Sequence, residues 1–402
     1  MGIFHTVRAG ASYLKSALLP LREEKSLEDF LINRFGRELY RTFFKDYTEK
    51  VWGVPCSEIS AEWGAQRIKG LSLSRALAHI LMRAIHPQGG GIAQKEIETS
   101  LIERFLYPKL GPGQLWELAA KEVVENGGEI HFGISIDRIL LNEGMMDGSV
   151  SRCVQSIEGV NDQGQRVSVS GDYFFSTMPV RDLIRGITPA VPLPVSAVSE
   201  GLMYRDFITV GLLVDHLTTT EKDGTPLKDN WIYIQEPDVK LGRLQIFNNW
   251  SPWLVNSPNK TWIGLEYFCN EGDPLWSLSD DYMANLAIKE AVQVGILRAE
   301  DVEDWNVVRV PKTYPAYFGS YELFDVIRQY VDEIRNLFLV GRNGMHKYNN
   351  QDHSMLTAMT AVENVINDVT TKDNIWAINT EVEYHEEKGS SERSREKHFV
   401  AR

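Results

Sequence analysis

The hydrophobic periodicity of this chain changes repeatedly along its length, and the order of the changes restricts the folds it can adopt. Up to about residue 106 apolar residues recur at helical spacing, and from residue 107 helical and strand patterns alternate. Aromatic and β-branched residues, which favour strands, then dominate residues 180–330. We therefore predict a mixed α/β protein whose ligand-binding domain is interrupted by a helical region and by an antiparallel sheet.

The first helix is predicted from Ser26, which has the spacing of a capping box with Asp29. The apolar residues that follow share one helix face: Leu27, Phe30, Leu31, Phe35, Leu39 and Phe43. After the turn YPKLGPG (107–113) a second helix is predicted, with Leu115, Leu118, Ala119 and Val123 on one side. It stops at Gly127-Gly128, and a strand with alternating Ile130, Phe132, Ile134 and Ile136 follows.

Four runs of residues predict the antiparallel sheet: FITVGLLV (207–214), NWIYIQ (230–235), RLQIFNNW (243–250) and TWIGLEYF (261–268). NLFLVG (336–341) reads as a buried strand before a closing helix, whose apolar face holds Met355, Met359, Val362 and Val365 or Ile366. The predicted division is therefore helical region 1–106, α/β part 107–179, sheet domain 180–330, closing strand–loop–helix 331–370 and a charged, disordered tail 371–402.

Composition excludes several classes of function. The 42 Lys and Arg residues against 55 Asp and Glu give a net charge of -13, which disfavours nucleic acid as a partner. No apolar run is long enough to span a membrane, so we expect a cytoplasmic protein whose partner is a small molecule. The three widely spaced cysteines and the scattered histidines predict neither disulfides nor a metal site.

Three stretches concentrate side chains that suit a nucleotide-linked sugar. Residues 47–67 contain Tyr47, Trp52, Trp63 and Arg67, and aromatic faces stack on bases while guanidinium groups hold phosphates. Tryptophans packed in a core at a helix boundary are the alternative, and composition alone favours it. Arg243 begins an otherwise apolar strand in GRLQIFNNWSP (242–252), where it either points into a cleft or is simply solvated.

The third stretch, GRNGMHKYNNQDHS (341–354), lies between the buried strand and the closing helix. Its glycines permit close backbone approach, and the following helix offers amides to an anion. His346 and His353 with Asp352 could form a metal or acid–base cluster, although Asp352 as a helix cap is the favoured interpretation. YPKLGPG lacks the P-loop order, so we interpret it as a tight turn beside a flat ligand.

These motifs resemble the flavin-dependent amine oxidase superfamily, which includes protoporphyrinogen oxidases. The resemblance covers residues 26–368 and rests on YTEKVWGVP (47–55), the 107–115 loop with GGEIHFGISIDRI (127–139), STMP (176–179) and LFLVGRNG (337–344). Within the superfamily the motifs are most similar to the UDP-galactopyranose mutase family, whose GRxGxxxYxxxD segment matches Gly341, Arg342, Gly344, Tyr348 and Asp352.

The resemblance implies an FAD enzyme that acts on a UDP-sugar in polysaccharide synthesis. In such mutases the reduced flavin carries the chemistry, so no catalytic side chain or metal is expected. The implied substrate-binding residues are Tyr47, Trp52, Arg67, Arg243, Tyr314, Arg342, Tyr348 and Asn350. The implied cofactor-binding residues are Gly111, Gly113, Gly341, Arg342, Gln351 and Asp352. The implied architecture is a Rossmann-like FAD domain, a substrate-facing helical region and a substrate-covering sheet.

One family feature has no counterpart in the sequence: the strand, GxGxxG and helix that place the FAD pyrophosphate at a helix N-terminus. Either the chain is N-terminally truncated or it is a relative that lost the motif, and in both cases weakened FAD binding is expected. Two other functions stay open: an amine or protoporphyrinogen oxidase acting on an apolar substrate, and a non-catalytic fragment or binding module.

Overall fold

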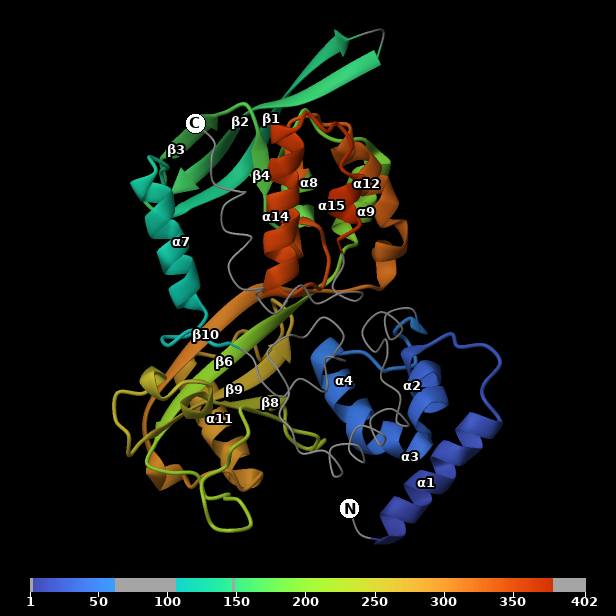
Figure 1. The fold of residues 1–402 in the computed structure, drawn as a ribbon, viewed down its shortest axis with the longest axis vertical. Coiled ribbons are helices and arrows are strands. Elements are labelled where there is room, and N and C mark those ends of the chain that lie inside the picture. Colours follow the sequence, from blue (N-terminus) through green and yellow to red (C-terminus); the bar gives the residue numbers. More distant parts are fainter. Residues whose placement is uncertain (1–2, 62–105, 147–148, 379–402) are drawn as a thin grey trace, which may run out of the picture.

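The computed structural model describes residues 3–61, 106–146 and 149–378, and it confirms the predicted mixed α/β class. Figure 1 shows a helical N-terminal part and an antiparallel sheet side by side, with an α/β part next to them. Three hydrophobic cores correspond to these parts. In the described residues, no helix combines the length and the apolar composition that crossing a membrane requires.

The N-terminal part begins with α1 (Ile3–Leu18) and α2 (Leu27–Phe35). The predicted capping box is present, because Ser26 Oγ accepts from the Asp29 amide and the Asp29 carboxylate accepts from the Ser26 amide, both at 3.2 Å. Leu27, Phe30, Leu31 and Phe35 are buried as predicted.

The predicted helical run breaks after Phe35, where Gly36 has φ 80°. The chain continues as α3 (Arg37–Leu39), the π-helix η1 (Tyr40–Lys45) and α4 (Asp46–Trp52). A π-helix has more residues per turn than an α-helix, so the face predicted from α-helical spacing is not kept. Phe43 is exposed for this reason, contrary to the prediction.

The five-stranded antiparallel sheet has the order β10–β6–β9–β8–β7. Its strands are β6 (Tyr204–Val214), β7 (Trp231–Tyr233), β8 (Arg243–Ile246), β9 (Thr261–Cys269) and β10 (Val302–Pro315). Its associated helices are α10 (Phe247–Trp250), η3 (Pro252–Leu254), α11 (Asp280–Gln293) and η4 (Ala299–Asp301). The buried side of α11, with Met283 and Ala287, shares a core with alternate residues of β6 and β9.

The predicted strand 243–250 ends at Ile246 because the next residues form the short helix α10. Asn248 Nδ2 donates to the Lys260 carbonyl at 2.8 Å, and Asn249 Nδ2 donates to the carbonyls of Leu227 and Asp229 at 2.9 and 2.8 Å. Asparagine side chains that bind neighbouring backbone groups compete with a strand ladder.

The α/β part contains a sheet of order β3–β2–β1–β5 and a separate parallel pair, β4 and β11. Its strands are β1 (Ile134–Met146), β2 (Ser149–Asn161), β3 (Arg166–Ser170), β4 (Phe174–Ser176), β5 (Ile187–Thr188) and β11 (Leu337–Leu339). Its helices are α7 (Gly113–Glu125), α8 (Val180–Gly186), α9 (Leu193–Glu200), η5 (Gly319–Leu323), α12 (Phe324–Asp332), α13 (Gly341–Gly344), α14 (Gln351–Ile366) and α15 (Asp373–Trp376).

Two predicted apolar helix faces are present but exposed. No residue of α7 is buried, and its face includes exposed Leu115 and Leu118. On α14 the predicted face is also exposed, with Ile366 at 72% of its full exposure, whereas Thr357 and Ala361 are buried instead. Both helices form where the sequence predicts them, yet nothing in the described part of the chain covers these faces.

The predicted strand before β1 differs as well. Ile130 and Phe132 precede the first residue of β1, Ile134, and both are exposed. A strand needs a hydrogen-bonded neighbour, and no described strand pairs with residues 129–132. The predicted strand therefore forms from Ile134 onward, whereas residues 129–132 carry the alternating pattern without forming a strand.

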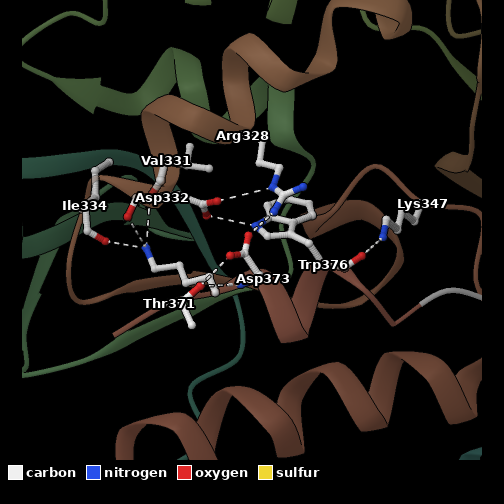
Figure 2. A network of polar contacts seen from close by, with 9 residues as sticks. Arg328, Val331, Asp332, Ile334, Lys347, Thr371, Asp373 and Trp376 are labelled. Carbon is white, nitrogen blue, oxygen red and sulfur yellow. Dashed lines mark hydrogen bonds and ion pairs between the residues drawn. The ribbon is translucent and has the colours of Figure 1, made fainter. Parts of the chain in front are cut away.

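Residues 371–378, predicted as the start of a disordered tail, contain α15 and are anchored. Ile375 and Trp376 are buried, and Trp376 Nε1 donates to Asp332 Oδ1 at 2.9 Å (Figure 2). Arg328 lies between Asp332 and Asp373, at 3.5 and 2.5 Å. The rest of the predicted tail, from residue 379, lies outside the described residues.

Lys372 fixes α15 to the end of α12. Its Nζ donates to the carbonyl oxygens of Val331, Asp332 and Ile334, at and just after the end of α12, at 3.1, 3.2 and 2.7 Å. Burial lowers the pKa of Lys372 from 10.5 to about 8.

We expect Lys372→Met to lower the free energy of unfolding by about 1–3 kcal/mol, because it removes three hydrogen bonds to carbonyl groups at and just after the end of α12. The pKa is lower in the folded chain, so the unfolded chain binds more protons between pH 8 and 10.5. The stability difference between wild type and variant should therefore grow as the pH rises through this window. Urea unfolding of both proteins at several pH values measures it, and a pH-independent difference would contradict the lowered pKa.

Candidate functional site

Aromatic rings from distant parts of the chain meet where α4, the antiparallel sheet and the 341–354 loop converge. Tyr47 of α4 lies 6.3 Å from Phe268 of β9 between ring centroids, and Phe268 lies 5.9 Å from Tyr314 of β10. Tyr314 stacks on Tyr348 at 5.2 Å, and Trp52 is 6.3 Å from Tyr348. Four of the predicted substrate-binding residues therefore belong to one cluster.

Arg243 enters this cluster from β8. The sheet register places Arg243 opposite Glu266 on β9, and the two side chains form an ion pair in which Glu266 is 1% exposed. The Arg243 guanidinium also donates to Tyr314 Oη at 3.3 Å and lies 4.2 Å from the centroid of Trp231. Of the two alternatives that the sequence leaves open for Arg243, the structure shows a buried side chain rather than a solvated one.

Glu266 holds the arginine in place from within the sheet. It also accepts a hydrogen bond from Gln245 Nε2. Burial raises the pKa of Glu266, while Arg243 and Gln245 act in the opposite direction by favouring the carboxylate. Because a buried charge is costly unless it is paired, the geometry of these three side chains is mutually fixed.

Arg342 approaches the same tyrosines from α13. Its Nε and Nη2 donate to the Asn349 carbonyl at 2.9 and 2.7 Å, and Nη1 donates to the Thr313 carbonyl at 3.1 Å. The guanidinium lies 4.6 Å from the centroid of Tyr348 and 5.6 Å from that of Tyr314. The hydrogen-bond partners of Arg342 within the described residues are therefore backbone carbonyls.

The YTEKVWG segment is held against the sheet by backbone contacts. Lys50 Nζ donates to the carbonyls of Ile234, Glu236 and Leu241 at 3.1, 2.6 and 3.1 Å. Gly53 ends α4 at φ 70° and lies against the Arg205 guanidinium, which a Cβ would meet at 3.0 Å.

The 341–354 loop packs closely on the C-terminal end of β4. A Cβ at Gly344 would lie 2.4 Å from the Ser176 carbonyl oxygen, so only glycine fits there. Gly341 has φ 75°, a conformation that glycine adopts without strain. Gly344 therefore lets the loop pack closely on the backbone of β4.

Buried polar atoms at this loop have no partner in the described part of the chain. They are Asn343 Oδ1, Asn349 Nδ2 and Ser176 Oγ. Native structures rarely leave such groups unsatisfied, and a ligand with donors and acceptors along one edge satisfies them. The loop and the end of β4 therefore hold polar atoms that a bound cofactor could satisfy.

His346 has a structural role. It is fully buried, and its Nε2 donates to the Ala316 carbonyl at 3.1 Å. Burial lowers the pKa of His346 to about 4, so the ring is neutral at pH 7. No group of three or more His, Cys, Asp or Glu side chains in the described ranges is arranged for a metal ion.

The other predicted residues occupy the margins of the site. Asn350 is the N-cap residue of α14, and Gln351 begins that helix; both are exposed. Asp352 lies in the first turn rather than at the cap, with Oδ1 2.9 Å from His353 Nδ1. Burial alone would raise the pKa of Asp352, but the hydrogen bond with His353 lowers it.

The predicted glycine turn is attached to the sheet. Gly111 has φ 87°, and Gly113 begins α7. Tyr107 stacks on Trp250 at 5.2 Å, and Ser251 Oγ donates to the Lys109 carbonyl at 2.7 Å. The role of Gly111 and Gly113 in cofactor binding stays a prediction. Arg67 and Trp63 lie outside the described residues.

Sequence reasoning missed Trp231, Tyr233, Glu266 and Phe268. Trp231 lies under Arg243, Tyr233 contacts Tyr47 edge-on at 4.6 Å, and they are 39% and 51% exposed. Two signals were available. Trp231 and Tyr233 are two residues apart and therefore share a strand face, and Glu266 is a lone charge in the apolar run TWIGLEYF.

Comparisons with known proteins place this geometry in a fold class. No protein-family model matches the chain. A solved structure of reduced UDP-galactopyranose mutase is similar with TM-score 0.70 and 19% identity, over 94% of this chain and 76% of that one. A putative protoporphyrinogen oxidase from Exiguobacterium sp. 255-15 gives 0.58 and 16%, over 90% and 72%. Putrescine oxidase bound to putrescine gives 0.52 and 12%, over 91% and 76%.

These similarities confirm the predicted fold. The chain shares its fold with UDP-galactopyranose mutase, whose motifs the sequence resembles, and with the two oxidases.

The ion pair provides a test of the site's architecture. We expect Glu266→Gln to lower the free energy of unfolding by about 3–5 kcal/mol, because it leaves Arg243 buried without a counter-charge. The matched control is Glu200→Gln, which removes the partner of exposed Arg185 and should cost about 1 kcal/mol or less. Equal losses in denaturant unfolding of the two variants would show that Arg243 is not buried against Glu266.

Proposed function

We propose that this protein is a flavin-dependent enzyme that acts on a nucleotide sugar, as a UDP-galactopyranose mutase does. One observation carries the proposal: Arg243 and Arg342, from separate parts of the chain, both contact Tyr314 within a cluster of aromatic rings. Guanidinium groups bind phosphate oxygens bidentately, and aromatic faces stack on bases and sugars. A nucleoside diphosphate combines the charge and the flat ring that this arrangement suits.

Each residue has a distinct part in substrate binding. Arg342, whose partners among the described residues are backbone carbonyls, supplies the charge for the diphosphate, while Arg243 is oriented by Glu266. The half-exposed Trp231 and Tyr233 provide ring faces at the border of the cluster, where a base can enter from solvent. Tyr314 and Tyr348 donate hydroxyl hydrogen bonds to phosphate oxygens.

The residues that hold FAD in this proposal are those of the 341–354 loop and the end of β4. The flavin edge satisfies the buried polar atoms of Asn343 and Asn349, while Gly344 lets the loop pack on the Ser176 carbonyl of β4. When bound in its reduced form, FAD supplies the nucleophile for the anomeric carbon. The protein's own contribution is to position the sugar and to neutralise the diphosphate charge.

The second candidate is an oxidase that acts on an apolar amine or porphyrinogen. The similarity to a putative protoporphyrinogen oxidase and to putrescine oxidase favours it. The buried arginine and the positive charge of Arg342 suit an anionic substrate better than an amine. Oxygen consumption with an apolar substrate, without binding of UDP, would favour this alternative.

Binding of UDP tests the substrate class. We expect Arg342→Ala to weaken UDP binding about tenfold or more in isothermal titration calorimetry, because it removes a charge-assisted contact. Arg342→Lys should recover part of the loss, since it keeps the charge without the planar fork.

Arg185→Ala is the matched control, because Arg185 is an exposed arginine that pairs with Glu200. It should leave UDP binding unchanged. Circular dichroism establishes that each variant is folded. A wild-type chain that binds no UDP, or an Arg342→Ala variant with unchanged affinity, would exclude the nucleotide-sugar function.

The flavin content tests the cofactor. We expect a fusion of a strand–GxGxxG–helix–strand segment to residue 1 to purify with flavin absorbance, because that segment supplies the amides for the pyrophosphate. Asn349→Leu in the fusion should reduce the bound flavin, since it replaces the unsatisfied donor of the loop. A fusion that purifies without flavin and binds none on addition of FAD would rule out a flavoenzyme.

A further inference from the structure

Helix α1 turns an apolar face away from the protein. The residues of this face recur at steps of three and four and fall within about 80° around the helix axis: Phe4, Val7, Ala11, Leu14 and Leu18. All of them are exposed, Phe4 to 91% and Leu18 to 77%. Figure 1 shows α1 at the outer edge of the helical N-terminal part. Because a surface helix normally turns its apolar face to the core, α1 is oriented the opposite way.

Small residues on the other side of α1 attach it to α2 and α3. Ala9 is buried there. The helix backbone passes so close to Gly36 that a Cβ at this glycine would lie 2.7 Å from the Tyr13 nitrogen. Ser12 Oγ accepts a hydrogen bond from the Glu38 amide at 3.2 Å. Rotation of α1 to bury its large apolar side chains would break these contacts, so the orientation of the helix is fixed.

The charges of this segment have one sign. Residues 3–22 contain Arg8, Lys15 and Arg22 but no Asp or Glu, although the whole chain has a net charge of -13. Arg8 lies four residues after Phe4, and Lys15 lies four residues after Ala11. Residues four apart are neighbours on a helix surface, so both cations flank the apolar face.

Nearby carboxylates leave this positive charge exposed. Glu38 pairs with Arg8 at 2.9 Å, but the Arg8 side chain stays 66% exposed. Glu23 and Glu24, which follow the segment, pair with cations outside it. The exposed surface of α1 therefore combines an apolar face with positive charge at its border.

We propose that α1 is an interfacial helix that binds the surface of a membrane containing anionic lipids. Helices that lie in the membrane interface have an exposed apolar face and Lys or Arg beside it. The apolar side chains enter the boundary of the acyl chains, while Arg8 and Lys15 extend to the headgroups. The helix lies on the membrane and does not cross it, since none of the described helices is suited to spanning. This inference is independent of the proposed function.

A second copy of this chain fits the same face less well. The spacing is also that of a coiled-coil seam, but α1 has 16 residues, whereas such a seam extends over at least three heptads, about 21 residues. Two parallel α1 helices bring each Lys15 near the other, and two antiparallel helices bring Lys15 near Arg8. No acidic residue of α1 compensates this repulsion, whereas anionic lipids attract the same cations.

Helix α7 also exposes apolar residues but carries the opposite charge. It contains Glu117, Glu122 and Glu125 against Lys121. An anionic membrane surface therefore repels α7 and attracts α1. Leu118 of α7, which is 57% exposed, is for this reason a suitable control position.

Flotation of the full chain with lipid vesicles tests the proposal. We expect binding to vesicles of phosphatidylcholine and phosphatidylserine, and binding about tenfold or more weaker to phosphatidylcholine alone, because the cations lose their anionic partners. Leu14→Glu and Leu18→Glu should each weaken binding to the mixed vesicles about tenfold or more, since each removes apolar contact and adds a negative charge. Lys15→Gln should weaken it about fivefold.

Leu118→Glu on α7 and Leu193→Glu on α9 are the matched controls, because they place the same charge at exposed apolar positions elsewhere. They should leave vesicle binding unchanged, and circular dichroism establishes that every variant is folded. No binding to the mixed vesicles, equal losses in the controls, or a dimer in light scattering that Leu18→Glu dissociates would overturn the proposal. A chain that binds vesicles but no UDP would support this surface and contradict the nucleotide-sugar function.

Discussion

The buried pair Arg243–Glu266 constrains the whole candidate site. A desolvated guanidinium is tolerated only with a counter-charge and further hydrogen bonds, and the β8–β9 register supplies the counter-charge directly opposite. The ring of Trp231 and the hydroxyl of Tyr314 complete the surroundings of Arg243. Because these groups come from four strands of one sheet, the sheet must be fully formed before the site exists.

The sheet alone does not make the site, since Arg342 arrives from the other domain. Its guanidinium ties the 341–354 loop to the end of β10 through the Thr313 carbonyl. The same loop is pressed on β4 at Gly344, where a side chain has no room. A ligand that contacts both arginines is therefore shared between the sheet and the α/β part, as is common for cofactor and substrate clefts.

Local signals in the sequence predicted which helices and strands form, but not which other elements they pack against. The capping box at Ser26 and the strand 261–268 depend on nearby residues, so they could be recognised from spacing. Glu266 and Trp231 matter because of a cross-strand register, which no local pattern reveals. Phe43 left its predicted face because of a π-helix, and α7 and α14 were predicted correctly as helices while their burial was not. That the site residues meet in one place could be predicted only from the family motifs.

The contacts of Lys50 have a consequence for access to the site. The Lys50 ammonium group donates hydrogen bonds to three carbonyls around the β7–β8 turn. These bonds connect α4 to the strand that carries Trp231 and Tyr233, so neither can move without the other. A bulky molecule that enters past the rings of Trp231 and Tyr233 therefore requires α4 and the β7–β8 hairpin to move together.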